Sequence, residues 1–362
     1  MRILHVINAL TSGGAEKLVF DLSQRMNRDC NVVEVLLLSS RNDVYASRLQ
    51  KLGVKVYQLS NRSVYNIFLI IPLIKFFYRN SFDIVHVHLF PSFYYISFMK
   101  KMHVIKCPII FHEHNTKNRR IESFFLRKID KLIYSQYSYV ICISDAVRAV
   151  LMKAYNLPKN KMIVIYNGID INECKKALPI NRKDIDASIL EDDILLVMVA
   201  RFNSQKDHVT LIKALNKLPE NFKLLLIGEG DTLNDIKTFV LNLNLSDRVF
   251  FLGYRSNPYC YIKSSDIFIL SSIFEGFGLS CVEAMACGIP VIASNVPGMA
   301  QVVGDVGVLF EVGNSDMLKD KILEVLSFRN NELKIMEFRR SEQFSIDIMI
   351  KSLYKIYNKS IC

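Results

Sequence analysis

Two glutamates beside a pair of glycines are the residues of this chain best placed to do chemistry. The segment 271–294 reads SSIFEGFGLSCVEAMACGIPVIAS, in which seven residues separate Glu275 from Glu283. Gly276 and Gly278 open a helix, so backbone N–H groups at its start can approach a phosphate. We expect Glu275 in the turn before that helix, where a carboxylate can reach sugar hydroxyls. Glu283 follows just over two helical turns later, with room to bind ribose hydroxyls.

Two cations follow the first strand predicted in the second half of the chain. In MVARFNSQKDH, Arg201 and Lys206 lie five residues apart, in the loop beyond the strand end. Arginine as a bidentate fork and lysine as a point charge can together neutralise a diphosphate leaving group. Exposed loop cations are common without any ligand, so the pattern alone leaves a plain surface loop open.

A glycine pair near the start of the chain offers a second phosphate-type loop. Gly13 and Gly14 follow the first predicted strand and precede the helical segment AEKLVFDLS. Backbone N–H groups exposed by glycines at a helix start can bind an anion. A tight turn without a ligand explains the same two residues equally well.

Two histidine pairs raise the question of a metal site. His86 and His88 end one predicted strand, and His112 and His114 end another. Four imidazoles could bind a metal ion. No carboxylate cluster with ligand spacing accompanies them, so we expect no metal site. Of the remaining histidines, we expect His5 and His103 to be structural and His208 to be a surface residue at a helix start.

The elements that would position these residues alternate regularly between strand and helix. Helices are expected at 15–26, 46–52, 209–217, 231–241, 258–263 and 280–286. The strand-like runs are ILHVIN, VVEVLLL, VKVYQL, DIVHVHL, PIIFHEH, YVICIS, MIVIYNG, ILLVMVA, FKLLLIG, RVFFLG, IFILSS, PVIAS and GVLFE. Such alternation predicts an α/β protein with parallel sheets built from right-handed crossovers.

A polar, acid-rich stretch at 170–193 interrupts this alternation and is expected to be a linker. The chain is therefore expected to form two Rossmann-like domains, 1–178 and 182–344. A helix over 345–362 is expected to pack back on the first domain. Because ligands bind at the carboxyl ends of parallel strands, we expect the two domains to face each other across a central cleft.

Composition and charge narrow the class of protein. Hydrophobic residues make up 51% and charged residues 22% of the chain, as in a globular protein. The eight cysteines form no CxxC pair and no leader is visible, so we expect a reduced, cytoplasmic protein. Residues 1–180 hold 26 Lys and Arg against 12 Asp and Glu, whereas the remainder holds 20 against 23.

The basic first half indicates either a solvated surface or attraction to an anionic membrane surface or a phosphorylated acceptor. Residues 62–80 form an apolar segment with basic ends that is too short and broken to span a bilayer. In 117–131, basic residues alternate with Ile121, Phe124, Phe125 and Ile129 at helical spacing. An amphipathic helix on a membrane would have this pattern, and so would a helix packed on its own sheet.

Taken together, these motifs resemble a known family. The chain is similar to the retaining glycosyltransferases of the GT-B fold that carry two glutamates seven residues apart (family four, group 1), such as glycogen synthase-like and bacterial polysaccharide enzymes. The likeness covers GGAEKLVFDL, YNGID, ARFNSQKDH, LLIGEG, FFLG and EGFGLSCVEAMACGIPV, and HEHN before basic residues resembles capsule, O-antigen and exopolysaccharide enzymes. One loop departs, because Pro297-Gly298 and Gln301 stand where the family often has Gly-Gly and Glu.

The resemblance implies that domain 1–178 binds the acceptor and domain 182–344 the nucleotide sugar, and it implies a role for each matching residue. Glu275 and His114 would be catalytic, with Glu275 contacting the transferred sugar and His114 the donor sugar and developing charge. The implied donor-binding residues are Gly14, Arg201, Lys206, Gly278, Leu279 and Glu283. Gly13 and Gly14 would form an acceptor and phosphate loop. No metal or other cofactor is implied, and the donor would be a UDP- or GDP-linked sugar.

The function implied is retaining transfer of a hexose or N-acetylhexosamine to a saccharide acceptor, lipid-linked, in bacterial surface polysaccharide biosynthesis. The anionic inner face of the cell membrane is an expected partner. No nucleophile pair like that of retaining glycosidases is visible, which favours front-face attack over a covalent intermediate. A GT-B sugar-nucleotide epimerase would share the fold. A basic nucleic-acid-binding protein is disfavoured, because interleaved aromatic and basic readout motifs are absent from the sequence.

Overall fold

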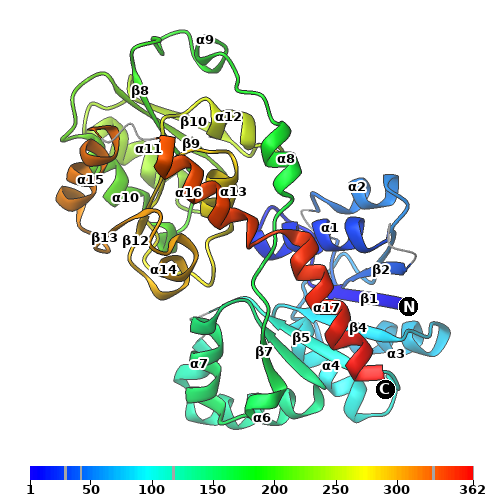
Figure 1. Ribbon diagram of the computed structural model, residues 1–362. Coiled ribbons are helices and arrows are strands. Elements are labelled where there is room, and N and C mark those ends of the chain that lie inside the picture. Colours follow the sequence, from blue (N-terminus) through cyan, green and yellow to red (C-terminus); the bar gives the residue numbers. More distant parts are fainter. Residues whose placement is uncertain (28–30, 41–42, 116–118, 328–330, 362) are drawn as a thin grey trace. The chain divides into compact units, whose positions relative to one another are not determined.

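The structure is a computed structural model that describes residues 1–27, 31–40, 43–115, 119–327 and 331–361 (Figure 1). The chain divides into two compact units. Unit 1 consists of Met1–Gly168 and Ile346–Cys362, and unit 2 of Ile169–Ser345. The boundary after Gly168 therefore comes earlier in the chain than the one predicted at residue 178. Each unit has its own parallel sheet and its own core.

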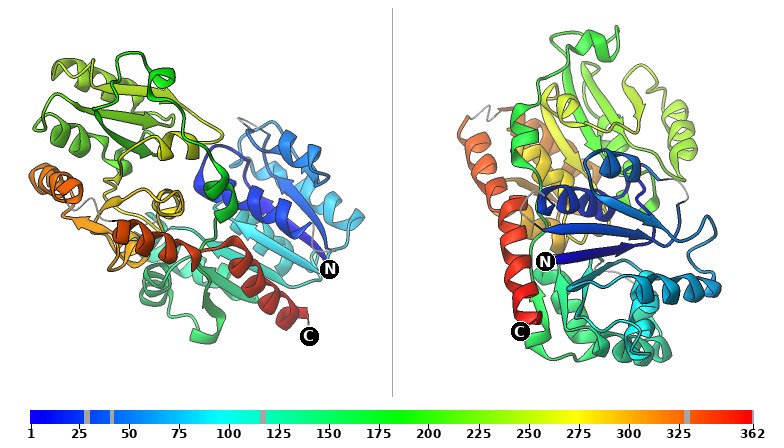
Figure 2. Two further views of the ribbon diagram at one scale, coloured as in Figure 1. Left: turned by 45° about the horizontal axis from the view of Figure 1, so that its top comes forward. Right: turned by 90° about the vertical axis from the view of Figure 1, so that its right-hand side faces the viewer.

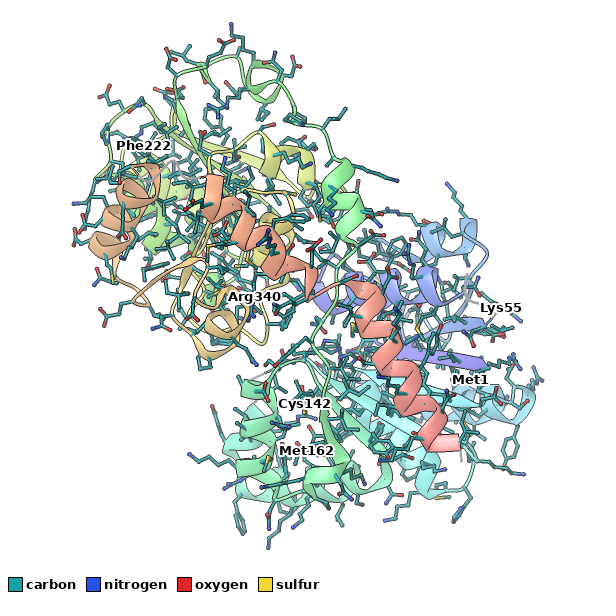
Figure 3. The ribbon with its side chains drawn as sticks, in the orientation of Figure 1. Met1, Lys55, Cys142, Met162, Phe222 and Arg340 are labelled. Atoms are coloured by element: carbon teal, nitrogen blue, oxygen red, sulfur yellow. The ribbon has the colours of Figure 1, made fainter. Side chains whose placement is uncertain are left out.

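Unit 1 is built on a seven-stranded parallel sheet with the order β3-β2-β1-β4-β5-β6-β7. Its strands are β1 (Arg2–Ile7), β2 (Val32–Leu37), β3 (Lys55–Gln58), β4 (Ile84–His88), β5 (Ile109–Glu113), β6 (Tyr139–Cys142) and β7 (Met162–Val164). Figure 3 marks Cys142 and Met162 on the neighbouring strands β6 and β7. The seven strands predicted for this half of the chain are confirmed.

Helices connect the strands of unit 1 and cover its sheet, as parallel pairing requires. They are α1 (Gly14–Met26), α2 (Ala46–Lys51), the 3-10 turn η1 (Ile67–Leu69), α3 (Ile70–Arg79), α4 (Ser92–Lys101), α5 (Arg119–Glu122), α6 (Phe124–Gln136), α7 (Asp145–Tyr155) and the turn η2 (Lys159–Lys161). Within the described residues of the whole chain, none of the helices combines the length and apolar character needed to cross a bilayer.

The last helix, α17 (Ile346–Ile361), belongs to unit 1 although it follows unit 2 in the sequence. Its buried Leu353 and Tyr357 share one hydrophobic cluster with Ile3 of β1. The Arg25 guanidinium of α1 contacts both carboxylate oxygens of Asp347, at 2.9 and 3.0 Å. Figures 1 and 2 show α17 running beside α1 and the sheet of unit 1.

Unit 2 contains a six-stranded parallel sheet with the order β10-β9-β8-β11-β12-β13. The strands are β8 (Ile194–Val199), β9 (Phe222–Ile227), β10 (Val249–Gly253), β11 (Ile267–Leu270), β12 (Val291–Ser294) and β13 (Val308–Phe310). Most of their side chains are buried, which suits a sheet covered by helices on both faces. The six strands predicted here are confirmed as well.

The helices of unit 2 include two in the stretch expected to be a linker. They are α8 (Ile171–Lys176), α9 (Arg182–Ile185), the turn η3 (Ser204–Lys206), α10 (His208–Leu215), α11 (Leu233–Asn242), α12 (Tyr259–Lys263), α13 (Leu279–Ala286), α14 (Pro297–Val303), α15 (Ser315–Ser327) and α16 (Asn331–Glu342). Arg182 binds the carboxylate of Asp266 at 2.9 Å and the carbonyl of Asp193 at 2.6 Å. These contacts make 170–193 part of unit 2.

One buried carboxyl in unit 2 makes stability depend on pH. Oε1 of Glu337 on α16 accepts a hydrogen bond from the backbone N–H of Val291 at 3.0 Å, and Oε2 has no partner among the described residues. Burial raises the pKa of Glu337 to about 8. The folded state therefore holds a proton that the unfolded chain, with a pKa near 4.3, releases earlier.

We expect the free energy of unfolding to fall by a few kcal/mol, in order of magnitude, as pH rises from about 4.5 to 8. The sign follows because the folded state binds more protons in that window. Glu337→Gln keeps the shape and the acceptor but cannot ionise. Its melting temperature relative to the unmodified protein should therefore rise with pH. A constant difference between pH 5 and 8 would contradict this assignment.

Candidate active site

An ion pair joins the two most prominent predicted site residues of unit 2. Lys206 ends η3 and Glu275 lies in the loop between β11 and α13, and the Nζ of Lys206 contacts Oε1 of Glu275. Their side chains are 19% and 11% exposed. Ser272 adds a hydroxyl 3.4 Å from the same carboxylate oxygen. Residues that are 69 positions apart in sequence are thus brought into one site.

Backbone contacts hold the two loops of this ion pair together. The carbonyl of Gln205 accepts from the N–H of Ile273 at 2.8 Å, and the side-chain amide of Gln205 donates to the carbonyl of Phe274 at 2.9 Å. Asn203 caps η3 by accepting from the N–H of Lys206. The loops that carry the cation and the carboxylate are therefore held together by hydrogen bonds to main-chain groups.

Gly278 sets the start of α13. Its φ of +84° lies in the left-handed region, which a glycine adopts without the strain that a side chain would bring. No side chain caps this helix end. The N–H groups at the first two positions, Leu279 and Ser280, have no partner within an α-helix, whereas the N–H of Cys281 donates to the carbonyl of Gly278 at 3.0 Å. A helix start of this kind attracts an anion, as expected for the predicted phosphate contact.

Gly298 packs directly against the backbone of the loop that carries Glu275. A Cβ at this position would lie 2.4 Å from the carbonyl oxygen of Glu275 and 2.8 Å from the carbonyl carbon of Gly276. Only a glycine permits this approach of α14. The Arg340 side chain, marked in Figure 3, donates to the carbonyls of Gln301 at 2.6 Å and Val302 at 3.1 Å, which fixes the other end of α14. The segment that departs from the family pattern is thus a packing element of the site.

Glu283, the second glutamate of the motif, is held by a residue that the sequence analysis missed. The hydroxyl of Tyr259 donates to Oε1 of Glu283 at 3.1 Å, and Tyr259 is buried. The tyrosine orients the carboxylate, whose two oxygens together offer about four lone-pair sites. Tyr259 stands beside Pro258 at the start of α12, where the sequence alone indicates only a helix start.

Arg201 lies in the loop after β8, together with Lys206. Its side chain is exposed, and it forms no ion pair within the described ranges. The N–H of Phe202 bonds the carbonyl of Glu229 at 3.0 Å, which ties this loop to the LLIGEG segment. The structure therefore places both predicted diphosphate cations beyond the carboxyl end of β8. Their contact with a diphosphate stays a prediction.

Gly13 and Gly14 lie at the start of α1 in unit 1. Gly13 is the N-cap residue with an extended φ of −82°, and no side chain caps the helix. The carboxylate of Glu16 occupies the space where a Cβ of Gly13 would be, 2.3 Å away, and accepts from the hydroxyl of Thr11 at 3.0 Å. The negative charge of this carboxylate would repel a phosphate beside the loop. Hydroxyl groups of a ligand, by contrast, could donate hydrogen bonds to it. The phosphate and acceptor roles of the two glycines stay predictions.

His114 follows β5 and is linked to other histidines of unit 1. Its Nε2 lies 3.3 Å from Nδ1 of His88, whose Nε2 lies 3.0 Å from Nδ1 of His5. His86 bonds the hydroxyl of Tyr357 at 2.6 Å, and His112 stacks on His114 with ring centres 4.6 Å apart. Burial lowers the pKa of His114 to about 3. These imidazoles are neutral at physiological pH.

The same histidines form two possible metal groups. The nitrogens of His5, His86 and His88, and those of His88, His112 and His114, lie within 4.8 Å of one another. The hydrogen bonds from His88 to His5 and to His114 already use both nitrogens of the shared ligand. A metal ion would have to displace them. The expectation of no metal site therefore stays a prediction with this geometric argument in its favour.

One histidine prediction is wrong. His208 was expected at the surface, but it is only 2% exposed, and its ring stacks on Phe202 with ring centres 4.2 Å apart. Burial lowers its pKa to about 4. The residue begins α10 as expected, and its side chain turns inward because an aromatic partner from the preceding loop covers it.

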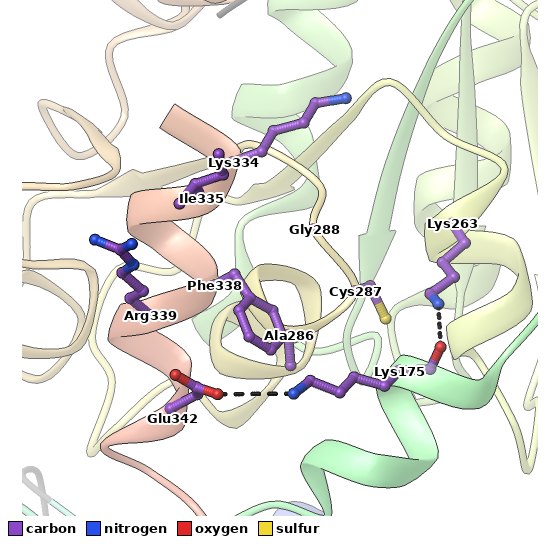
Figure 4. Close-up of a pocket in the computed structure, with 10 residues that line it drawn as sticks. All are labelled: Lys175, Lys263, Ala286, Cys287, Gly288, Lys334, Ile335, Phe338, Arg339 and Glu342. Carbon is purple, nitrogen blue, oxygen red and sulfur yellow. Dashed lines mark hydrogen bonds and ion pairs between the residues drawn. The ribbon is translucent and has the colours of Figure 1, made fainter. Parts of the chain in front are cut away.

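A separate basic pocket of unit 2 lies beside the end of α13 (Figure 4). It adjoins Cys287, after α13, and not Gly278, where α13 begins. Its polar lining comprises Lys175, Lys263, Lys334, Arg339 and Glu342. The Nζ of Lys175 lies 3.7 Å from Glu342 and that of Lys263 bonds the carbonyl of Lys175. Lys334 and Arg339 supply a matched control for the predicted diphosphate site.

Comparisons with known proteins agree with this architecture. Residues 181–341 match the family described as Glycosyl transferases group 1, and residues 12–173 match Glycosyltransferase Family 4. The solved structure of Anabaena Alr3699/HepE in complex with UDP-glucose is similar, with a TM-score of 0.86 over 99% of this chain and 100% of that one. Its sequence identity of 21% shows the fold alone. Two parallel-sheet α/β units of this kind define the GT-B fold.

Curated relatives extend the likeness. An N-acetylgalactosaminyltransferase of Campylobacter jejuni, named for an acceptor on diphospho-undecaprenol, is 26% identical, with 86% of each chain covered. The N-acetyl-alpha-D-glucosaminyl L-malate synthase of Bacillus anthracis is 28% identical, with 87% of this chain and 85% of the relative covered. With the two family matches, these findings show that the chain belongs to the group 1 glycosyltransferases of the GT-B fold.

Proposed function

We propose that this glycosyltransferase moves a hexose or N-acetylhexosamine from a UDP- or GDP-linked donor to a lipid-linked saccharide, with retention and without a metal ion, in bacterial surface polysaccharide biosynthesis. The observation that carries the donor part is the Lys206–Glu275 pair near the uncapped start of α13. A cation and a helix N-terminus can stabilise a departing diphosphate, the role that a divalent metal has in other transferases. Front-face attack remains the favoured route.

The donor assignment predicts graded losses of nucleotide binding. Arg201→Ala and Lys206→Ala should each weaken UDP or GDP binding by about 1–3 kcal/mol, because each removes a charge-assisted contact. We expect the larger loss for Lys206→Ala, since it also removes the cation that faces the Glu275 carboxylate. Isothermal titration calorimetry with the bare nucleoside diphosphate measures this directly.

The basic pocket provides the control for that titration. Lys334→Ala and Arg339→Ala remove cations of the same kind from the same unit and should leave the binding constant unchanged. The assignment would be contradicted if Lys206→Ala bound UDP or GDP as tightly as the unmodified protein. It would also be contradicted if the two pocket variants lost this binding, since the diphosphate would then bind elsewhere.

The acceptor part rests on an exposed aromatic and basic surface of unit 1. On α6, Phe124 and Phe125 are 67% and 70% exposed, so packing on the sheet does not account for them. Residue 117, where this amphipathic segment was expected to begin, lies outside the described residues. The inner side of α6 is fixed by Asp130, which accepts hydrogen bonds from Tyr94 and Tyr155. Hydrogen bonds on its inner side therefore hold α6 in place, while Phe124 and Phe125 face outward.

The apolar segment at 62–80 also exposes aromatic side chains, and an exposed cation accompanies those of α6. The ring centres of Tyr65 and Phe90 are 6.1 Å apart, and the Nζ of Lys128 lies 4.6 Å from the centre of the Phe124 ring. Phe68, in η1, is 67% exposed. Exposed aromatics beside cations suit the interface of an anionic bilayer, where the side chains insert and the charges contact headgroups. This supports peripheral attachment at the cytoplasmic face of the membrane.

Liposome flotation tests this attachment. The protein should float with anionic vesicles at low salt and be released as salt is added, because headgroup attraction is screened within a Debye length. Phe124→Ser with Phe125→Ser should lower the floating fraction at least tenfold, because these two side chains can no longer insert into the bilayer. The paired control, Ile335→Ser with Met336→Ser, changes exposed apolar residues of unit 2 and should float normally. Failure of the unmodified protein to float would favour a soluble acceptor.

A further inference from the structure

Three histidines of unit 1 form a single chain of ring nitrogens. Nδ1 of His5 faces Nε2 of His88 at 3.0 Å, and Nδ1 of His88 faces Nε2 of His114 at 3.3 Å. The rings of His5 and His88 are fully buried. The register of the sheet creates this chain, because His5 pairs with His86 on the adjacent β4 and His88 pairs with His112 on β5. Side chains two residues apart on β4 share one face.

Each of these imidazoles carries one hydrogen. Burial lowers the pKa of His5 to about 4 and that of His114 to about 3, and it lowers the pKa of His88 well below its ordinary value. In a neutral imidazole, one nitrogen donates and the other accepts. Two hydrogen bonds in series therefore leave two arrangements only. Either every Nδ1 carries the hydrogen, or every Nε2 does.

The far end of the chain distinguishes the two arrangements. Nε2 of His5 is buried and has no partner among the described residues. An unpaired buried N–H is rarer and less favourable than an unpaired acceptor. His5 therefore places its hydrogen on Nδ1 and donates to His88, which in turn donates to His114. Both nitrogens of His112 lack a partner in the described structure, so hydrogen bonding selects no tautomer for that residue.

We infer that His5 and His88 hold His114 in the tautomer with its hydrogen on Nδ1, so that His114 meets its ligand as a hydrogen-bond donor and not as a base. Nε2 of His114 is occupied by the Nδ1–H of His88, and Nδ1 is the nitrogen left for the ligand. The acceptor it suits is an oxygen atom, such as a sugar hydroxyl. Only the identity of that oxygen rests on the proposed function. His5 and His88 are positioning residues in this account.

The tautomer can be read without any substrate. Long-range ¹⁵N–¹H correlation spectra of histidine-labelled protein distinguish a protonated Nδ1 from a protonated Nε2, and His114→Gln identifies the signals of His114. We expect His5, His88 and His114 all to show a protonated Nδ1 at pH 7. A protonated Nε2 on His114 would overturn the inference, even if the protein proves to be a fully active glycosyltransferase.

Two variants of His88 separate tautomer control from simple packing. An asparagine side chain can place its amide N–H near the position of Nδ1, so His88→Asn should keep the Nδ1–H signal of His114. His88→Leu fills the space without a donor, and we expect the Nε2–H form of His114 to become populated. His103→Gln, at an exposed histidine, is the control. An unchanged His114 signal in a folded His88→Leu protein would contradict the inference. An unmodified protein that shows the three Nδ1–H signals but transfers no sugar would count against the proposed function alone.

Discussion

Glu275→Ala is expected to lower turnover by at least about 100-fold, as the loss of one well-placed polar group in an active site commonly does. The carboxylate is 11% exposed and held by Lys206, so its geometry is set before any donor arrives. Nucleotide binding should persist or tighten, because the freed Lys206 cation can turn fully to the diphosphate. The measurement is steady-state transfer together with calorimetric nucleotide binding.

An exposed ion pair of the same unit gives the matched control for this variant. Glu324 pairs with Lys321 at 2.7 Å on α15, with side chains 44% and 27% exposed. Glu324→Ala removes a carboxylate of the same kind and should leave turnover and binding unchanged, since surface pairs contribute little. Near-normal transfer by a folded Glu275→Ala protein would remove Glu275 from the catalytic residues.

Gly298→Ala is expected to have an effect of similar size by a different route. The added Cβ would meet the Glu275 carbonyl oxygen at 2.4 Å, so the loop carrying the catalytic carboxylate has to move. A displacement near 1 Å in a site can cost about 100-fold in rate. We therefore expect a loss of this order in turnover, with a lower melting temperature. Steady-state transfer assays and thermal melts measure both.

Gly313→Ala separates this steric effect from the general cost of replacing glycine. Gly313 has a φ of +76°, and an added Cβ would have nothing within 4 Å. Its alanine variant should lose about 1 kcal/mol of stability from the left-handed backbone and keep full activity. Equal activity of the two alanine variants would contradict the claim that α14 supports the Glu275 loop.

Strand positions were predictable because buried parallel strands are nearly continuous apolar runs. ILLVMVA and FKLLLIG, for example, became β8 and β9 with bounds close to those runs. The Glu275 and Glu283 motif was visible for a similar reason, since both glutamates lie in one short local segment around α13. Patterns confined to one short segment can be recognised without knowing which distant segments contact it.

Contacts between distant segments could not be predicted in the same way. Tyr259 and Glu283 meet across 24 residues, and no pattern in the sequence pairs a tyrosine with a particular carboxylate. Gly298 gives no sign in the sequence that its missing side chain admits the Glu275 backbone. The inward turn of His208 depends on Phe202. Such features follow from the sheet order and the packing of helices on it, which the alternation of elements leaves open.

Product analysis with an isotope-labelled panel of nucleotide sugars tests the central claim most directly. Purified protein is incubated with each UDP- or GDP-sugar and a bacterial lipid extract, and both the free nucleoside diphosphate and the labelled lipid are quantified. A glycosyltransferase of this kind should release the diphosphate and label the lipid in equal amounts with one donor, and Glu275→Ala should abolish both. Conversion of a donor to an isomeric nucleotide sugar, without labelled lipid, would contradict the account and indicate an epimerase.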